Sequence, residues 1–114
     1  MNTVTIGVSS LEQSMHRFEA ASRGEKQGEH LSFATIELMW KVLIPRRWEM
    51  LQAMTGKPPM SLRSVARLMD RDVKTTHGDV HALLRAGILQ KDESGKLVFP
   101  YDAIHVDFMI NKAA

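Results

Sequence analysis

The sequence contains no cysteine, so disulfide bonds, thiolate catalysis and zinc sites of the CxxC type are excluded. It contains no apolar run that approaches the length of a membrane span. It also lacks the combination of a cationic segment and a long apolar core that makes a signal peptide. From these absences we expect a soluble cytoplasmic protein.

Motifs of several enzyme classes are missing too: there is no glycine-rich phosphate loop, no GxSxG elbow and no Cys/His pair. The neighbouring carboxylates Asp70 and Asp72 suit a turn and a helix cap better than acid–base catalysis. His77 and His81 stand four apart and could face one metal ion, but the glutamate of an HExxH site is absent. We therefore expect no enzyme, no cofactor and no metal site.

What the sequence does have is an uneven charge. The net charge is only +2, yet residues 41–91 carry ten basic residues against four acidic ones, and the flanking segments are acidic in balance. Such a basic segment is typical of a surface that faces nucleic acid, although a solvated helical surface can carry the same charges. The contents of 44% hydrophobic and 25% charged residues are ordinary for a globular protein of 114 residues.

Two short helices joined by a polar turn are predicted between residues 61 and 87. Ser61 and Asp72 are each placed to cap the unpaired N–H groups of a helix start, and Gly87 suits the position just past a helix end. The joint at residues 70–72 has no apolar side chain. Apolar residues at helical spacing should face inward: Leu62, Val65, Ala66 and Met69 in the first helix, and Val73, Val80, Leu83 and Leu84 in the second.

Between its inward positions, the second helix should present side chains that can donate hydrogen bonds to phosphates or base edges. The candidate DNA-binding residues are Arg46, Arg47, Ser61, Arg63, Arg67, Arg71, Lys74, Thr75, Thr76, His77, His81 and Arg85. Among them the arginines should mainly fix the DNA backbone, whereas the side chains that should reach base edges or adjacent phosphates are Lys74, Thr75, His77 and His81. Gly78 costs about 1 kcal/mol relative to alanine inside a helix. Two explanations of this glycine stay open: a partner approaches the helix backbone closely there, or the fold simply tolerates the residue.

The N-terminal part has a different pattern. Alternation over residues 3–8 predicts a strand, and Ser9 or Ser10 can form a capping box that starts a helix over residues 11–22. Glycine and charge then replace the apolar positions, so residues 23–30 are predicted to be a linker. We expect a strand-helix extension over residues 1–30, used for dimerisation or partner binding, and a main domain over residues 31–114.

The rest of the main domain is predicted from spacing and from proline and glycine. One helix should bury Ile36, Met39, Trp40 and Leu43, and a second, opened by Pro45 and stopped by Gly56, should bury Trp48, Leu51 and Met54 with Met50 at its edge. A hairpin should join residues 88–91 to residues 96–99 through a turn at 92–95. A final strand with one apolar face is expected over residues 103–110.

This order of elements is that of a winged helix-turn-helix domain, a mainly α fold with a small β component (α+β). The run from Phe33 to Ile110 resembles a family of small MarR-like winged helix-turn-helix predicted transcriptional regulators, some of which are antitoxins encoded beside toxin genes. The segments that carry the resemblance are Leu43-Ile44-Pro45-Arg46-Arg47, Arg71-Asp72-Val73-Lys74, His77-Gly78-Asp79-Val80 and Pro100-Tyr101-Asp102-Ala103-Ile104. The sequence departs from the usual helix-turn-helix pattern at two places: at Asp70, where a turn glycine is frequent, and at the acidic wing tip Asp92-Glu93.

The residues and the resemblance together predict a sequence-specific regulator that binds double-stranded DNA as a homodimer. The resemblance further implies an autorepressing antitoxin with a toxin protein as partner. Two alternatives stay open: a MarR-like repressor without a toxin, and a winged-helix protein-interaction module that does not bind DNA.

Overall fold

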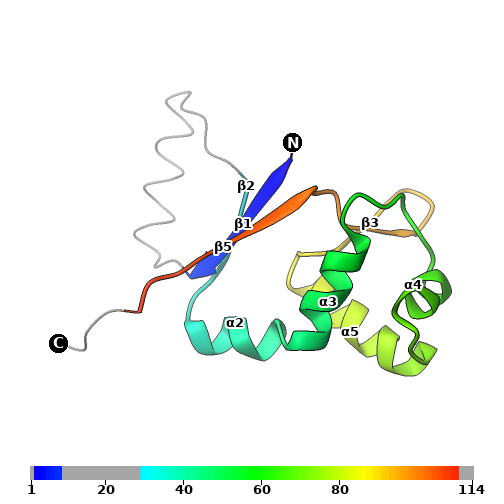
Figure 1. Ribbon diagram of the computed structural model, residues 1–114, viewed down its shortest axis with the longest axis horizontal. Helices are drawn as coiled ribbons and strands as arrows, with labels where there is room; N and C mark the ends of the chain where they lie inside the picture. Colours follow the sequence, from blue (N-terminus) through cyan, green and yellow to red (C-terminus); the bar gives the residue numbers. More distant parts are fainter. Residues whose placement is uncertain (1, 9–28, 111–114) are drawn as a thin grey trace.

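The computed structural model describes residues 2–8 and 29–110, and it has helices and a small sheet, an α+β arrangement (Figure 1). The elements are β1 (Thr3–Val8), β2 (Glu29–Phe33), α2 (Ile36–Val42), α3 (Pro45–Met54), α4 (Leu62–Met69), α5 (Val73–Arg85), β3 (Gln90–Lys91), β4 (Leu97–Val98) and β5 (Ala103–Asp107). The helix predicted for residues 11–22 lies outside the described residues. No described helix is long and apolar enough to cross a membrane.

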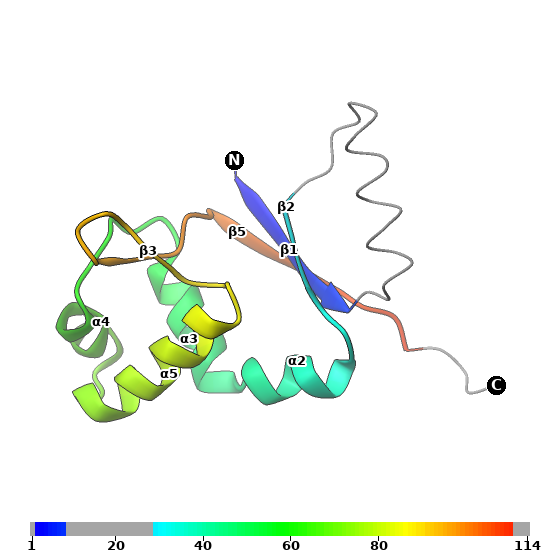
Figure 2. The same ribbon diagram turned by 180° about the vertical axis from the view of Figure 1, so that it is seen from behind.

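A three-stranded parallel sheet joins the two ends of the described chain. Its strand order is β2-β1-β5, and β1 pairs in the centre with Val4 opposite Ile104 and Ile6 opposite Val106. All four described helices lie between β2 and β5 in the sequence, and both views place them to one side of the sheet (Figures 1 and 2). Strands near the two ends of the described chain therefore pair with each other, and the helices lie on one side of the sheet that they form.

Strand β1 is part of the main core and does not belong to a separate extension. Val4 and Ile6 have no exposed surface and share one hydrophobic cluster with Met39 and Leu51 of the helices. Residues 3–8, which we expected in an extension used for dimerisation or partner binding, thus have their apolar face covered by helices of the same chain. The predicted linker also ends too late, since Glu29 and His30 already belong to β2.

The first two described helices begin where the sequence predicts and bury somewhat different faces. Thr35 caps α2, which begins at Ile36, and Pro45 is the first residue of α3. Trp40 is 48% exposed, whereas Met50, expected at an edge, is fully buried. Met50 belongs to the same core cluster as Val4 and Ile6 of β1 and Val80 of α5.

The helix pair α4–α5 follows the predicted caps closely. The Ser61 hydroxyl accepts a hydrogen bond from the Ser64 N–H at 3.1 Å, and the Asp72 carboxylate accepts one from the Thr75 N–H at 2.9 Å. Asp70 ends α4 in the left-handed conformation, with φ of 54°, which explains why glycine is common at such a position. Gly87 has φ of 77° just past α5, as predicted.

The inward face of α5 differs from the prediction. Val73 is 42% exposed, and the buried positions are Thr76, Asp79, Val80 and Leu83. These four residues lie on one face of the helix. We assigned only apolar residues to that face, but a threonine and an aspartate also belong to it.

The hairpin strands are shorter than predicted and are tied to the start of α4. The Met60 N–H donates to the Leu97 carbonyl at 2.9 Å, and the Leu97 N–H donates back to the Met60 carbonyl at 2.8 Å. In the turn, one Asp92 carboxylate oxygen accepts hydrogen bonds from the N–H groups of Ser94 and Lys96, each at 2.9 Å. The final strand is also shorter than predicted: β5 ends at Asp107, and Met109 and Ile110 beyond it are largely exposed.

Gly7 is the glycine on which the sheet depends most. A Cβ atom at this position would overlap the backbone carbonyl oxygen of Asp107 on β5. Because a backbone atom cannot rotate away, we predict that Gly7→Ala lowers the free energy of unfolding by about 1–3 kcal/mol. Chemical denaturation measures this loss. Gly78→Ala is the matched control, since a Cβ there would meet no atom within 4 Å, and an equal loss in both variants would contradict the account.

Candidate nucleic-acid interface

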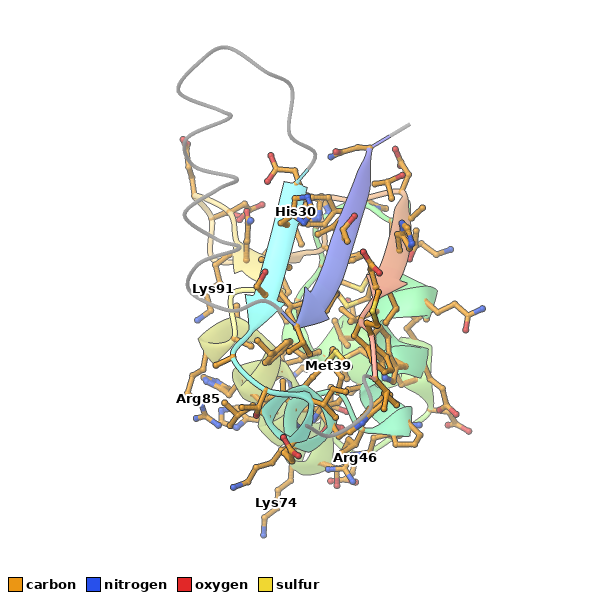
Figure 3. The ribbon with its side chains drawn as sticks, turned by 90° about the vertical axis from the view of Figure 1, so that its left-hand side faces the viewer. His30, Met39, Arg46, Lys74, Arg85 and Lys91 are labelled. Atoms are coloured by element: carbon orange, nitrogen blue, oxygen red, sulfur yellow. The ribbon has the colours of Figure 1, made fainter. Side chains whose placement is uncertain are left out.

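Helix α5 presents a polar face on the side away from its buried residues. Lys74, Thr75, His77 and Arg85 are exposed, and His81 is half-buried. Figure 3 shows Lys74 and Arg85 projecting outward from the helical part, away from the sheet. The sequence placed these five residues on the outer face of the helix, and the structure confirms that placement. Lys74, Thr75, His77 and Arg85 are thus open to solvent, and His81 is partly so.

The rings of His77 and His81 lie in contact on this face, with centroids 4.0 Å apart and planes tilted by 38°. Burial lowers the pKa of His81, and the nearby charges of His77, Lys91 and Arg85 lower it further. Both causes favour a neutral His81 near pH 7, which can donate one hydrogen bond and accept another. In the described parts of the chain, no group of three or more metal-ligating side chains surrounds the pair.

The hairpin adds a basic residue that the sequence analysis did not single out. Lys91 of β3 is exposed, and with His81 it lines a small cleft of about 110 Å³ between the helix pair and the hairpin. In Figure 3, Lys91 and Arg85 lie on the same side of the molecule. The position of Lys91 could have been inferred from the sequence, because a hairpin directly after α5 must fold back along that helix.

Helix α4 supplies two further free cations. Arg63 and Arg67 are exposed, and neither takes part in an ion pair with any other described residue. Ser61 is exposed at the start of the same helix, but its hydroxyl serves as the cap and donates to the Ser64 hydroxyl at 3.0 Å. Arg63 and Arg67 are thus available to a partner, whereas Ser61 has a structural use already.

Thr76 cannot contact DNA, and our assignment of it is wrong. Its side chain has no exposed surface, and its hydroxyl donates to the Asp72 carbonyl at 2.9 Å, one turn back in α5. A threonine whose hydroxyl is satisfied by its own helix can be buried at little cost. For that reason it occupies the inward face of α5 beside Val80.

Asp79 is the main residue that the sequence analysis missed. Its carboxylate has no exposed surface, and it is bound by two arginines of α3. Arg46 Nε lies 2.8 Å from one carboxylate oxygen, and Arg47 Nε lies 2.9 Å from the other. Arg47 also donates to the Val42 carbonyl at 2.8 Å, at the end of α2. A single buried carboxylate therefore joins α5 to α3, and through Arg47 to α2.

Contacts within the fold change the roles of two predicted arginines, Arg47 and Arg71. Arg47 is only 15% exposed at its side chain, so its assignment as a phosphate contact is wrong, while Arg46 remains 47% exposed. Arg71 is held by Glu49 at 2.8 Å and donates to the Arg46 carbonyl at 3.3 Å, which fixes the turn between α4 and α5 against α3. Arg47 and Arg71 thus support the helix that carries the exposed face.

One family model matches the chain over residues 42–106, which is more than half of its length. The chain belongs to the HVO_A0114 family. The HVO_A0114 match spans α3, α4, α5, the β3–β4 hairpin and nearly all of β5, so it contains both the Asp79 cluster and the exposed face of α5. Comparison with curated proteins gave no match, and comparison with solved structures gave none.

The Asp79 cluster should dominate the acid sensitivity of the fold. Burial raises the pKa of the Asp79 carboxyl, but hydrogen bonds and charges from Arg46 and Arg47 outweigh it and hold the pKa below its ordinary value. A lowered folded-state pKa stabilises the protein above the ordinary value, about 4, and this contribution is lost as the pH falls through the folded-state pKa. We predict that Asp79→Asn costs about 3–5 kcal/mol at neutral pH, because two arginines lose a buried partner.

Denaturant unfolding from pH 7 down to pH 3 tests this prediction. The wild type should lose stability below about pH 4, and Asp79→Asn should lack that part of the pH dependence. Glu49→Gln is the matched control, since it removes a carboxylate that is 61% exposed and should cost less than about 1 kcal/mol. Equal costs for the two variants would show that the buried cluster does not hold the helices together.

Proposed function

We propose that this protein is a winged helix-turn-helix regulator that binds double-stranded DNA. In this proposal α4 and α5 form the helix-turn-helix, α5 lies in the major groove, and the β3–β4 hairpin is the wing. The observation that supports it is that several acidic groups are bound within the fold, whereas several cations near them are not. Asp72 caps α5, Asp79 is buried between two arginines and Glu49 is paired with Arg71, so these three acidic groups are used within the fold.

The cations beside them have no such partners. Among the described residues, no ion pair involves Arg63 or Arg67 of α4, Lys74 or Arg85 of α5, or Lys91 of the hairpin. A surface with unpaired cations and neutral hydrogen-bond donors suits phosphate contacts at its margin and base contacts at its centre. A protein-interaction module needs no such surface, and this favours DNA binding over that alternative.

The wing has a narrower role than its acidic tip suggests. Asp92 uses its carboxylate to form the turn, as its contacts with Ser94 and Lys96 show. Glu93 remains exposed at the tip. We infer that the wing contacts DNA through Lys91 at its base, next to His81, and does not insert its tip into the minor groove.

The protein acts in this proposal as a homodimer that represses transcription, and its resemblance to MarR-like antitoxins suggests an autorepressing antitoxin. A repressor without a toxin partner is the second candidate. The burial of Val4 and Ile6 means that β1 is not free to bind a toxin. Co-expression with the product of an adjacent small open reading frame tests this: rescue from its toxicity supports the antitoxin function, and no rescue favours the simple repressor. We propose no catalytic activity.

Binding measured over a range of salt concentrations separates phosphate contacts from base contacts. We predict that Arg67→Ala weakens binding to all duplexes and lowers the salt slope by about 1, because one phosphate contact is lost. His77→Ala should cost about 1–3 kcal/mol on the preferred duplex and little on a shuffled one. Arg71→Ala removes the same charge, but Glu49 already holds it, so its slope should change less. Identical slopes in Arg67→Ala and the wild type would contradict the assignment.

Gly78 tests whether a partner approaches the middle of α5. Nothing in the fold requires glycine there, since a Cβ would meet no atom within 4 Å. Gly78→Ala should therefore raise the free energy of unfolding by up to about 1 kcal/mol. At the same time we predict weaker DNA binding, by about 1–3 kcal/mol, because the added methyl group separates the helix from the groove. Greater stability with unchanged affinity would mean that Gly78 is merely tolerated.

A further inference from the structure

Among the described strands, β5 is an edge of the sheet, and its hydrogen-bonded neighbour is β1 alone. The Asp107 carbonyl oxygen lies against Gly7 of β1. Because backbone groups of successive strand residues point to alternate sides, those of Ile104 and Val106 point to the open edge. The segment Ala103–Asp107 has neither the proline nor the lysine that commonly protects an edge strand.

An apolar groove lies beside this open edge. Ile104 and Val106 face the helices, because they pair with the buried residues Val4 and Ile6, yet Val106 is 41% exposed. Trp48 of α3 and Thr55, which follows that helix, form the opposite wall, and the groove has a volume of about 500 Å³. The described helices thus bury Val4 and Ile6 of β1 but leave Val106 of β5 partly exposed.

The apolar surface continues past the end of the groove. Phe108 packs edge-on against Trp40 of α2, with ring centroids 5.6 Å apart, and Trp40 remains 48% exposed. Ile104, Val106 and Phe108 therefore form one stripe that runs along α3 and reaches α2. A stripe of this kind, next to unpaired backbone groups, favours an occupant that is itself an apolar strand.

We propose that the occupant is a second copy of this chain, whose β5 pairs antiparallel with the first across a two-fold axis at His105. The two sheets then form one sheet of six strands. The proposal rests on the proposed function in one respect: a two-fold dimer presents two copies of α5 to two DNA half-sites.

The sequence of β5 is complementary to itself in this register. A two-fold axis at His105 sets Ile104 of each chain opposite Val106 of the other, on the side of the groove, so two apolar pairs close it. On the opposite side of the sheet, Asp107 of each chain lies diagonal to His105 of the other, where the carboxylate can accept a hydrogen bond from an imidazole N–H. An unrelated peptide would need this pattern by chance, whereas a second copy supplies it.

Because the chain has no cysteine, a single introduced cysteine tests the register directly. In the proposed pairing, the two residues at position 105 form a non-hydrogen-bonded pair with Cα atoms about 4.5 Å apart. That separation lies within the range that a disulfide spans, about 4.4–6.8 Å. His105→Cys should therefore oxidise to a covalent dimer at micromolar concentration. His30→Cys is the control, because His30 is exposed on β2, the strand at the other edge of the sheet (Figure 3).

Sedimentation of the full chain gives the second readout. The wild type should be a dimer, and Val106→Asp should raise the dimer dissociation constant roughly 100-fold, because a charge then lies in the apolar groove. Since Val106 is partly exposed, the variant should keep the wild-type circular dichroism spectrum, and Gln52→Ala, on the groove wall, should stay dimeric. A monomeric wild type, or equal cross-linking of His105→Cys and His30→Cys, would overturn the proposal. DNA binding by a monomer would leave the DNA-binding part of the proposed function standing and remove its homodimer, and a dimer without DNA binding would remove only the DNA-binding part.

Discussion

The orientation of α5 depends on one buried carboxylate. Asp79 can be buried only because Arg46 and Arg47 neutralise it, since an unpaired charge in a protein interior costs several kcal/mol. With Asp79 turned inward, Lys74 and His77 lie on the opposite side of the helix and face solvent. The same two arginines begin α3, which packs on α4, so the cluster sets the position of the whole helix pair. The proposed DNA surface is therefore organised by a cluster whose carboxylate is buried and whose Arg47 side chain is only 15% exposed.

Local features of the sequence predicted local features of the structure. The caps at Ser61 and Asp72, the start of α3 at Pro45, and the glycine after α5 all depend on a few neighbouring residues. The polar face of α5 was predicted for the same reason. Such features follow from hydrogen bonds and backbone conformations that span less than two helical turns, and they do not depend on the rest of the chain.

The errors concern contacts between residues far apart in the sequence. Asp79 was overlooked because its partners lie more than thirty residues away, although a carboxylate at the spacing of Thr76, Val80 and Leu83 is a signal that could have revealed it. Strand β1 was placed outside the core because its pairing with β5 spans nearly the whole chain. Helical spacing shows that a face is apolar, but it does not show which segment covers that face.

The central claim is that the exposed face of α5 reads DNA sequence. Selection of bound duplexes from a randomised pool, followed by footprinting of the enriched sequence, tests it most directly. The account predicts an inverted repeat whose half-sites are centred about one helical turn, 10–10.5 base pairs, apart, with protection of the major groove in each half. Failure to retain any duplex at physiological salt, or retention without enrichment of a sequence, would contradict it.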